Sequence, residues 1–119
     1  MANEFRFRPC HRLLLEVEYG GVFKQRRVIR GALLDLHFAP GATASARLGL
    51  VVPKRNAALS VTRNRCKRVA RELFRHRRAE LPALDLVLRL AKSTKSIDRE
   101  AIGPMLREEF DKLLRRLPR

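Results

Sequence analysis

The sequence has few cysteines, few acidic residues and no long apolar run. Only Cys10 and Cys66 are present among 119 residues, which favours two free thiols over a disulfide framework. No stretch approaches the roughly 18 consecutive apolar residues that a transmembrane helix needs. Residues 1–12 alternate charged and aromatic side chains and contain no apolar signal-peptide core. We therefore expect a cytoplasmic protein that does not act at a membrane, with residues 1–12 as a flexible arm.

The usual signatures of an enzyme are also missing. The sequence has no glycine-rich phosphate loop and no nucleophile elbow. Its cysteines and histidines lack the spacing of metal ligands. We therefore expect no catalytic residue in the protein and no metal ion held by the protein alone.

What the sequence has in excess is positive charge. It contains 27 Lys and Arg against 12 Asp and Glu, for a net charge of +15. Residues 19–79 carry most of this excess, with 15 basic residues and only two acids. Hydrophobic residues make up 45% of the chain, so it is not a disordered basic tail. The length fits one domain over residues 1–119, and the charge fits a polyanionic partner such as RNA or DNA.

The hydrophobic pattern predicts an α+β fold. Strict alternation of apolar and polar residues indicates strands, and apolar residues three or four apart indicate helices. The predicted elements are a helix at 13–23, a basic loop or short strand at 24–31, strands at 32–38 and 47–52, a helix at 58–77, a strand at 84–91 and a helix at 98–117. The two strands joined by a short connection are expected to pair antiparallel. Pro104 is expected to begin the main part of the last helix after one preliminary turn.

The helix predicted at 58–77 is strongly amphipathic. Its apolar arc contains Leu59, Thr62, Cys66, Val69, Ala70, Leu73 and Phe74. Its opposite arc contains Asn64, Arg65, Lys67, Arg68, Arg71 and Arg75. Such a ridge of donors can follow a phosphate backbone without contacting base edges. Cys66 lies in the apolar arc, so we expect it to be a small buried hydrophobe.

The order of residues in this segment is more specific than its charge. The sequence Arg63-Asn64-Arg65-x-Lys67-Arg68-x-x-Arg71-Glu72-x-Phe74-Arg75 resembles the RNR signature of the bacterial ribonuclease P protein family. The preceding Gly49-Leu50-Val51-Val52-x-Lys54-Arg55 is similar to the strand and basic turn of that family. The likeness extends over about residues 10–115.

The resemblance implies an accessory subunit of an endoribonuclease. In that family the protein binds a catalytic RNA that removes the 5′ leader of precursor tRNA. The active site and its Mg²⁺ belong mainly to the RNA. The implied partners are the ribonuclease P RNA and precursor tRNA, with no obligate protein partner.

The resemblance also assigns residues to three RNA-binding regions. The RNR helix would use Arg63, Asn64, Arg65, Lys67, Arg68, Arg71 and Arg75, and the basic turn would use Lys54 and Arg55. A cleft for the single-stranded leader would be lined by Tyr19, Phe23 and His37. For Tyr19 and Phe23 the alternative is ordinary core packing, and for His37 it is a solvated strand position.

The fold implied by the resemblance is a single domain with the order α-β-β-(β)-α-β-α. It has a mixed sheet packed by helices, similar to the second domain of small-subunit ribosomal protein five. Its βαβ crossover is left-handed, although such crossovers are right-handed in nearly all proteins.

Three other functions compete with this one. A ribosomal or ribosome-assembly protein would use the same ridge on rRNA without any cleavage role. A DNA-binding module would need a helix-turn-helix pair, which the sequence does not offer. A protein-only nuclease would need a carboxylate cluster for metal ions, for which Asp35 and Asp85 are the only suitable pair.

Overall fold

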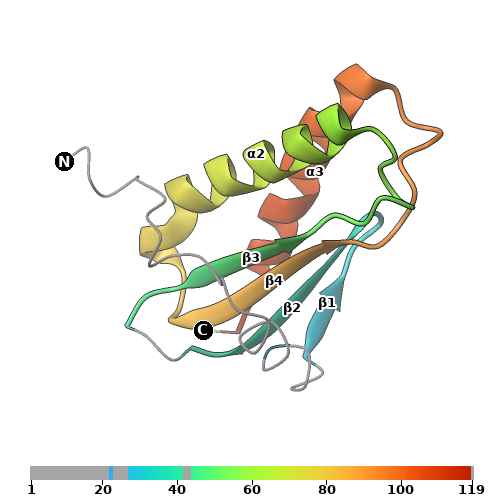
Figure 1. The fold of residues 1–119 in the computed structure, drawn as a ribbon. Coiled ribbons are helices and arrows are strands. Elements are labelled where there is room, and N and C mark those ends of the chain that lie inside the picture. Colours follow the sequence, from blue (N-terminus) through green and yellow to red (C-terminus); the bar gives the residue numbers. More distant parts are fainter. Residues whose placement is uncertain (1–21, 23–26, 42–43, 119) are drawn as a thin grey trace.

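The computed structural model describes residue 22 and residues 27–41 and 44–118. Within these ranges the elements are β1 (Val28–Arg30), β2 (Leu34–Pro40), β3 (Arg47–Val51), α2 (Ser60–Arg77), the 3₁₀ helix η3 (Arg78–Glu80), β4 (Leu84–Leu90) and α3 (Arg99–Arg115) (Figure 1). Apart from Val22, which is helical, the predicted helix at 13–23 lies outside the described residues, as do the predicted arm and Cys10. The predicted strands at 32–38, 47–52 and 84–91 and both remaining helices are confirmed to within two residues at each end. The segment predicted as a loop or short strand contains β1.

The strands form one mixed sheet in the order β1-β2-β4-β3. β2 runs antiparallel to β1 and β4, whereas β3 runs parallel to β4. The prediction that the second and third strands pair with each other is wrong, because β4 lies between them. β2 and β4 each bury five of their seven residues, whereas β3 buries two of five. Pairing β2 with β4 places the two most buried strands at the centre of the sheet. The free energy gained by burying their apolar surface exceeds the chain entropy that direct pairing of β2 with β3 would save.

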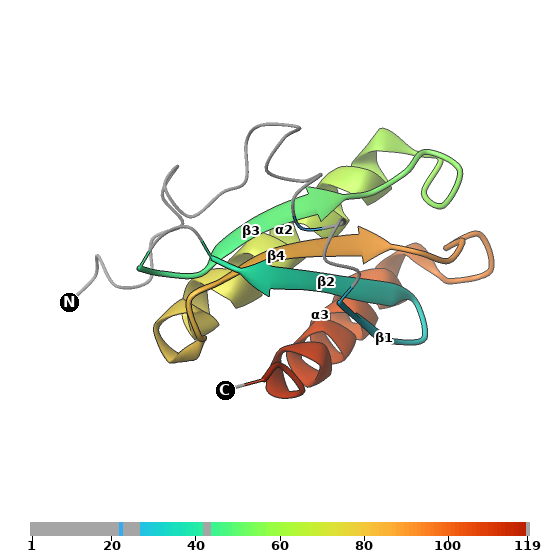
Figure 2. The same ribbon diagram turned by 90° about the horizontal axis from the view of Figure 1, so that it is seen from below.

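Both helices cover the same face of the sheet. Figure 2 shows the sheet from the opposite side, with α2 and α3 behind it. Apolar side chains at alternate positions of β2 and β4 lie on the helix-covered face. They are Leu34, Leu36 and Phe38 of β2 and Leu86, Leu88 and Leu90 of β4. This layer of side chains, packed against Phe74 of α2 and Phe110 of α3, forms the core.

The connection from β3 through α2 to β4 is left-handed. In Figure 1, β3 and β4 point the same way, α2 returns above the sheet, and β4 lies behind β3. The path therefore turns counterclockwise as it moves away from the viewer. This confirms the handedness that the family resemblance implied, against the strong general preference for right-handed crossovers.

α2 buries the apolar arc that the sequence predicted, with one correction. Thr62, Cys66, Ala70 and Leu73 are buried, and burial raises the pKa of the Cys66 thiol. Leu59 is instead 54% exposed. It precedes the helix with an extended backbone (φ −84°, ψ 134°), so the helical periodicity does not apply to it.

α3 is one continuous helix, and the prediction that Pro104 starts its main part is wrong. Pro104 removes only the N–H group that would have donated to the carbonyl of Glu100. Both residues are exposed, so water can satisfy that carbonyl. Ile102 is buried in the core, and packing of this first turn keeps it helical.

Two carboxylates of α3 fasten it to the rest of the domain. The Oε2 atom of Glu109 accepts hydrogen bonds from the backbone N–H groups of Leu33 (2.8 Å) and Leu34 (2.6 Å). Asp111 forms an ion pair with Arg77 at the end of α2 (3.1 Å). These contacts fix the helix layer relative to the sheet.

Candidate RNA-binding surface

The outer face of α2 carries a row of cationic and amide side chains. Asn64 and Arg68 are exposed, and Lys67, Arg71 and Arg75 are half-buried. They recur three or four residues apart, so they lie along one side of the helix. Lys67 and Arg68 form no ion pair with any residue that the structure describes. Their charges are therefore available to an external anion.

The start of α2 strengthens this positive surface. No side chain caps the helix, and its first turn contains no acidic residue. The free N–H groups at a helix start carry a partial positive charge that favours anions. Four cations lie in the first half of the helix, near this end, namely Arg63, Arg65, Lys67 and Arg68, and the others follow in its second half.

Arg63 has a structural contact that the sequence did not suggest. Its NH1 group donates to the carbonyl oxygens of Ala57 (3.0 Å) and Ala58 (2.8 Å). The guanidinium thus holds the connection that leads into α2. A role of Arg63 in RNA binding stays a prediction.

Arg65 lies to one side of the row, across α3. A Cβ atom at Gly103 would approach the Nε atom of Arg65 to 3.1 Å. Glycine at this position therefore lets the guanidinium lie against the first turn of α3. Arg65 extends the positive surface from α2 onto its neighbour.

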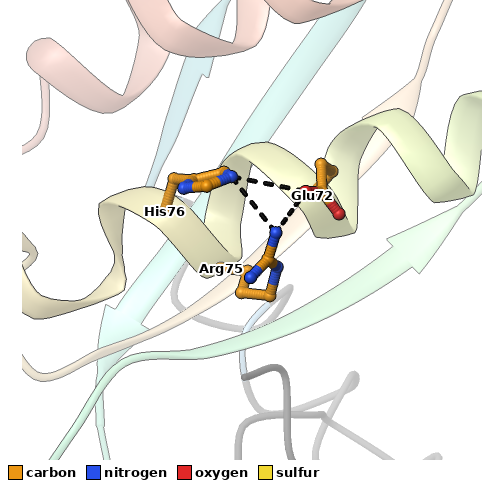
Figure 3. A network of polar contacts seen from close by, with 3 residues as sticks. All are labelled: Glu72, Arg75 and His76. Carbon is orange, nitrogen blue, oxygen red and sulfur yellow. Dashed lines mark hydrogen bonds and ion pairs between the residues drawn. The ribbon is translucent and has the colours of Figure 1, made fainter. Parts of the chain in front are cut away.

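Arg75 differs from the other cations because an acid on the same helix engages it. Figure 3 shows Glu72, Arg75 and His76 joined in one network. The Arg75 guanidinium donates to the Glu72 carboxylate, and His76 lies 3.3 Å from the same carboxylate oxygen. The hydrogen bond from Arg75 lowers the pKa of Glu72, so the carboxylate stays ionised.

Replacing Glu72 by glutamine is expected to increase RNA affinity about two- to fivefold at low salt, the scale of an exposed ion pair. The change releases Arg75 and removes an acidic charge from the cationic face. The measurement is RNA binding as a function of salt, with Glu108→Gln as the control on the far face of α3. Equal affinities for the two variants would show that Arg75 lies outside the RNA interface.

The basic turn lies between β3 and α2. Lys54 and Arg55 are both exposed. The neighbouring Asn56 anchors the turn, because its Nδ2 group donates to the Leu90 carbonyl (2.7 Å) and its own carbonyl accepts from the Thr94 hydroxyl (2.8 Å). The two cations therefore project from a fixed piece of backbone.

His37 lies on the sheet face that α2 and α3 leave uncovered. It pairs in register with Val28 of β1 and Val87 of β4 and is half-buried. On the same face Val22 packs against Ala39 and Val87. The other two residues predicted for the leader cleft, Tyr19 and Phe23, lie outside the described residues.

Burial lowers the pKa of His37 below its usual 6.5, and Arg89 and Arg30 lower it further against the opposing effect of Asp35. Below pH 6.5 the unfolded chain binds this proton more readily than the folded protein does. The histidine therefore costs stability as the pH falls through that value. We expect His37→Gln to reduce the loss of stability between pH 7.5 and 5.5, measured by urea unfolding. Equal losses of stability in the wild type and the His37→Gln variant over this pH range would contradict this.

The two carboxylates considered for a nuclease site are not placed to share metal ions. Asp35 is opposite Arg89 on β4, and Asp85 is opposite Ala39 on β2. Four residues along the sheet separate them by about 13 Å, whereas paired catalytic metal ions lie about 4 Å apart. Each also has its own arginine, Arg30 for Asp35 and Arg47 for Asp85. Within the described ranges no three His, Cys, Asp or Glu side chains form a group that could hold a metal ion.

Sequence analysis missed the pair of Arg47 and Asp85. The two side chains form a bidentate contact at 2.9 and 2.7 Å, with only 12% and 10% of their surfaces exposed. These residues are 38 positions apart and meet only through the parallel register of β3 and β4. No local signal in the sequence indicates such a pair.

Comparisons with known proteins identify the family of the chain. A family model described as Ribonuclease P matches residues 7–118. A ribonuclease P protein component from Bordetella avium is 47% identical over 104 residues, covering 86% of this chain and 87% of the relative. One from Azoarcus sp. is 43% identical over 108 residues, covering 91% and 90%.

Solved structures give the same result for the fold. The ribonuclease P protein from Thermotoga maritima aligns with a TM-score of 0.73 at 26% identity, covering 91% of this chain and 98% of that one. The Staphylococcus aureus protein aligns with a TM-score of 0.77 at 18% identity, covering 88% and 93%. No α-helix in the described part of the chain is both long and apolar enough to span a membrane.

Proposed function

The chain belongs to the ribonuclease P protein component family, and from this premise we propose that two of its surfaces hold RNA. The family assigns the chain an RNA-binding role in tRNA 5′ processing, as part of an endoribonuclease complex that contains the ribonuclease P RNA. We propose that the outer face of α2 binds this RNA. The sheet face opposite the helices is proposed to hold the 5′ leader of precursor tRNA.

One observation carries the first assignment, namely the row of cations on α2. Lys67 and Arg68 have no acidic partner among the described residues, and Glu72 is the only acid on the helix. Binding to phosphates releases counterions from the RNA, and this release drives association. Asn64 adds both a donor and an acceptor to the row, which a phosphate contact alone does not require.

We propose that the RNA, and not the protein, carries out the chemistry of leader cleavage. We propose that the RNA would hold most of the Mg²⁺ ions of the complex, which would supply activation of water and stabilisation of the leaving oxygen. The protein's own residues then bind and orient. Cations of α2 neutralise RNA phosphates near the reaction, which reduces the repulsion between the two RNA molecules and favours their close approach.

The leader assignment rests on the character of the open sheet face. His37 is half-buried there, and its lowered pKa keeps the imidazole neutral at pH 7. A neutral ring can stack on an unpaired base, as aromatic side chains do in proteins that bind single strands. Arg30 and Arg89 next to it supply charge for the leader phosphates.

Reconstitution tests this function. The protein is mixed with a bacterial ribonuclease P RNA and precursor tRNA at low Mg²⁺, and release of the 5′ leader is followed. We expect stimulation that the RNA alone does not reach, and we expect it to shrink when the leader is trimmed to a stub. Alanine at Tyr19, Phe23 or His37 is expected to weaken binding of the full-length substrate only. Equal weakening for the trimmed substrate would contradict the leader assignment.

A ribosomal or ribosome-assembly role gives a different outcome in the same experiment. Such a protein would bind structured RNA tightly through α2 but would not stimulate leader release. Tight binding without stimulation would therefore assign the α2 surface to phosphate binding alone.

A further inference from the structure

A hollow surface lies beside the cationic row, at the start of α2. A pocket of about 430 Å³ is formed by the turn before α2, the first turn of α2 and the segment that leads from β4 into α3. A smaller pocket of about 270 Å³ adjoins it and shares Thr62, Arg99 and Ile102 as walls. The hydrogen bonds of Asn56 with Leu90 and Thr94 hold the two sides of the larger pocket together. The hollow is thus part of the folded framework.

Unpaired cations surround the hollow. Arg55, Lys95 and Arg99 line the larger pocket, and Arg65 lines the smaller one. None of the four forms an ion pair with any residue in the described part of the chain. Glu100 is the one acidic residue among the described residues that line the two pockets. Against four cations it leaves the net charge around the hollow strongly positive.

Polar groups inside the hollow are also without partners. Thr62 lines both pockets and is only 8% exposed, and its hydroxyl makes no hydrogen bond to a described residue. The backbone N–H groups of Ser60, Val61 and Thr62 have no acceptor in the described ranges. A phosphate oxygen can accept from several of these donors at once.

The rim of the hollow is apolar. Leu59 is 54% exposed and Val61 is 61% exposed, and they are two of the three large apolar side chains with this exposure among the described residues. Leu59 lines the larger pocket together with Ile97, and Val61 lines the smaller pocket. Contact with such apolar walls does not stabilise a bound inorganic anion, whereas it stabilises the face of a bound nucleobase.

We propose that this hollow binds one unstacked nucleotide of the RNA that α2 contacts. The phosphate lies at the first turn of α2 between Lys95 and Arg99, and the base packs on the apolar walls. Arg65 joins the hollow to the row on α2, so one RNA strand can follow both. This inference rests on the proposed function and adds to it a contact contributed by the β4–α3 connection.

Binding by the free protein is tested with two probes in backbone-amide and methyl NMR. Uridine 5′-monophosphate is expected to shift the amides of Val61 and Thr62 and the methyl groups of Leu59. Inorganic phosphate is expected to shift the amides alone. Two variants are compared with the wild type, namely the double variant Lys95→Gln with Arg99→Gln and the single variant Thr62→Val. In each variant the shift changes caused by the nucleotide and by phosphate should be at least fivefold smaller. An absence of these local shifts in the wild type, or unchanged shifts in both variants, would overturn the proposal.

The complete complex supplies the second test, with a charge-matched control. Lys112→Gln combined with Arg116→Gln removes the same charges about 20 Å away, at the other end of α3. We expect the Lys95 and Arg99 double variant to weaken binding of the ribonuclease P RNA five- to twentyfold and the control to change it less than twofold. Equal effects of the two double variants would refute the nucleotide site. Failure of the wild type to stimulate leader release would instead refute the proposed function.

Discussion

Replacing Lys67 and Arg68 together by alanine is expected to weaken binding of the ribonuclease P RNA by about 10- to 100-fold. Both cations lie on the outer face of α2 without an acidic partner among the described residues. Each contact with a phosphate releases a counterion, so the slope of log affinity against log salt should fall in magnitude by about two. The measurement is RNA binding by filter retention or fluorescence at several salt concentrations.

The charge-matched control separates a contact from a general charge effect. Lys112→Ala combined with Arg116→Ala leaves the same net charge but acts at the C-terminal end of α3. This control should keep most of the affinity and nearly all of the salt slope. An unchanged slope for the Lys67 and Arg68 variant, in a protein with wild-type thermal stability, would refute the phosphate contacts.

Replacing Asp85 by alanine is expected to destabilise the fold by about 3–5 kcal/mol, because it removes the carboxylate that neutralises the buried guanidinium of Arg47. Both side chains are nearly enclosed, with 12% and 10% of their surfaces exposed. The loss corresponds to a fall in melting temperature of ~10–20 °C. Thermal unfolding followed by circular dichroism measures it.

A compensating double variant tests the cause of that loss. Arg47→Met combined with Asp85→Leu removes both charges and keeps side chains of similar volume. Such replacements of buried ion pairs are often neutral, so most of the lost stability should return. If the double variant is as unstable as Asp85→Ala, the defect arises from packing and the ion pair is not its cause.

The helices and the cationic row on α2 were predictable from the sequence because they depend on local periodicity. Apolar residues such as Cys66 and Leu73 recur on one side of α2, while Lys67 and Arg68 recur on the other. The rule fails where periodicity ends. Leu59 satisfies the spacing but precedes the helix, and Pro104 is tolerated because Ile102 holds the turn by packing.

The open sheet face around His37, where we propose that the leader binds, was predictable only in part. The family resemblance identified His37, and the alternation of β2 placed it on the face away from the helices. Its lowered pKa depends on burial and on Arg89, which is opposite Asp35 on a strand 50 residues later in the chain. The hollow at the start of α2 likewise combines residues from two distant segments.

The local elements, the cationic face of α2 and, through the RNR segment, the family can all be read from the sequence alone. These depend on contacts between residues close in sequence, where side-chain periodicity has a fixed geometric meaning. Only the tertiary structure reveals the strand order, the pair of Arg47 with Asp85 and the hollow beside Thr62, and it confirms the left-handed crossover that the family resemblance implied. Those features depend on how much apolar surface each arrangement of the whole chain removes from water, which is a sum over distant contacts that no local pattern encodes.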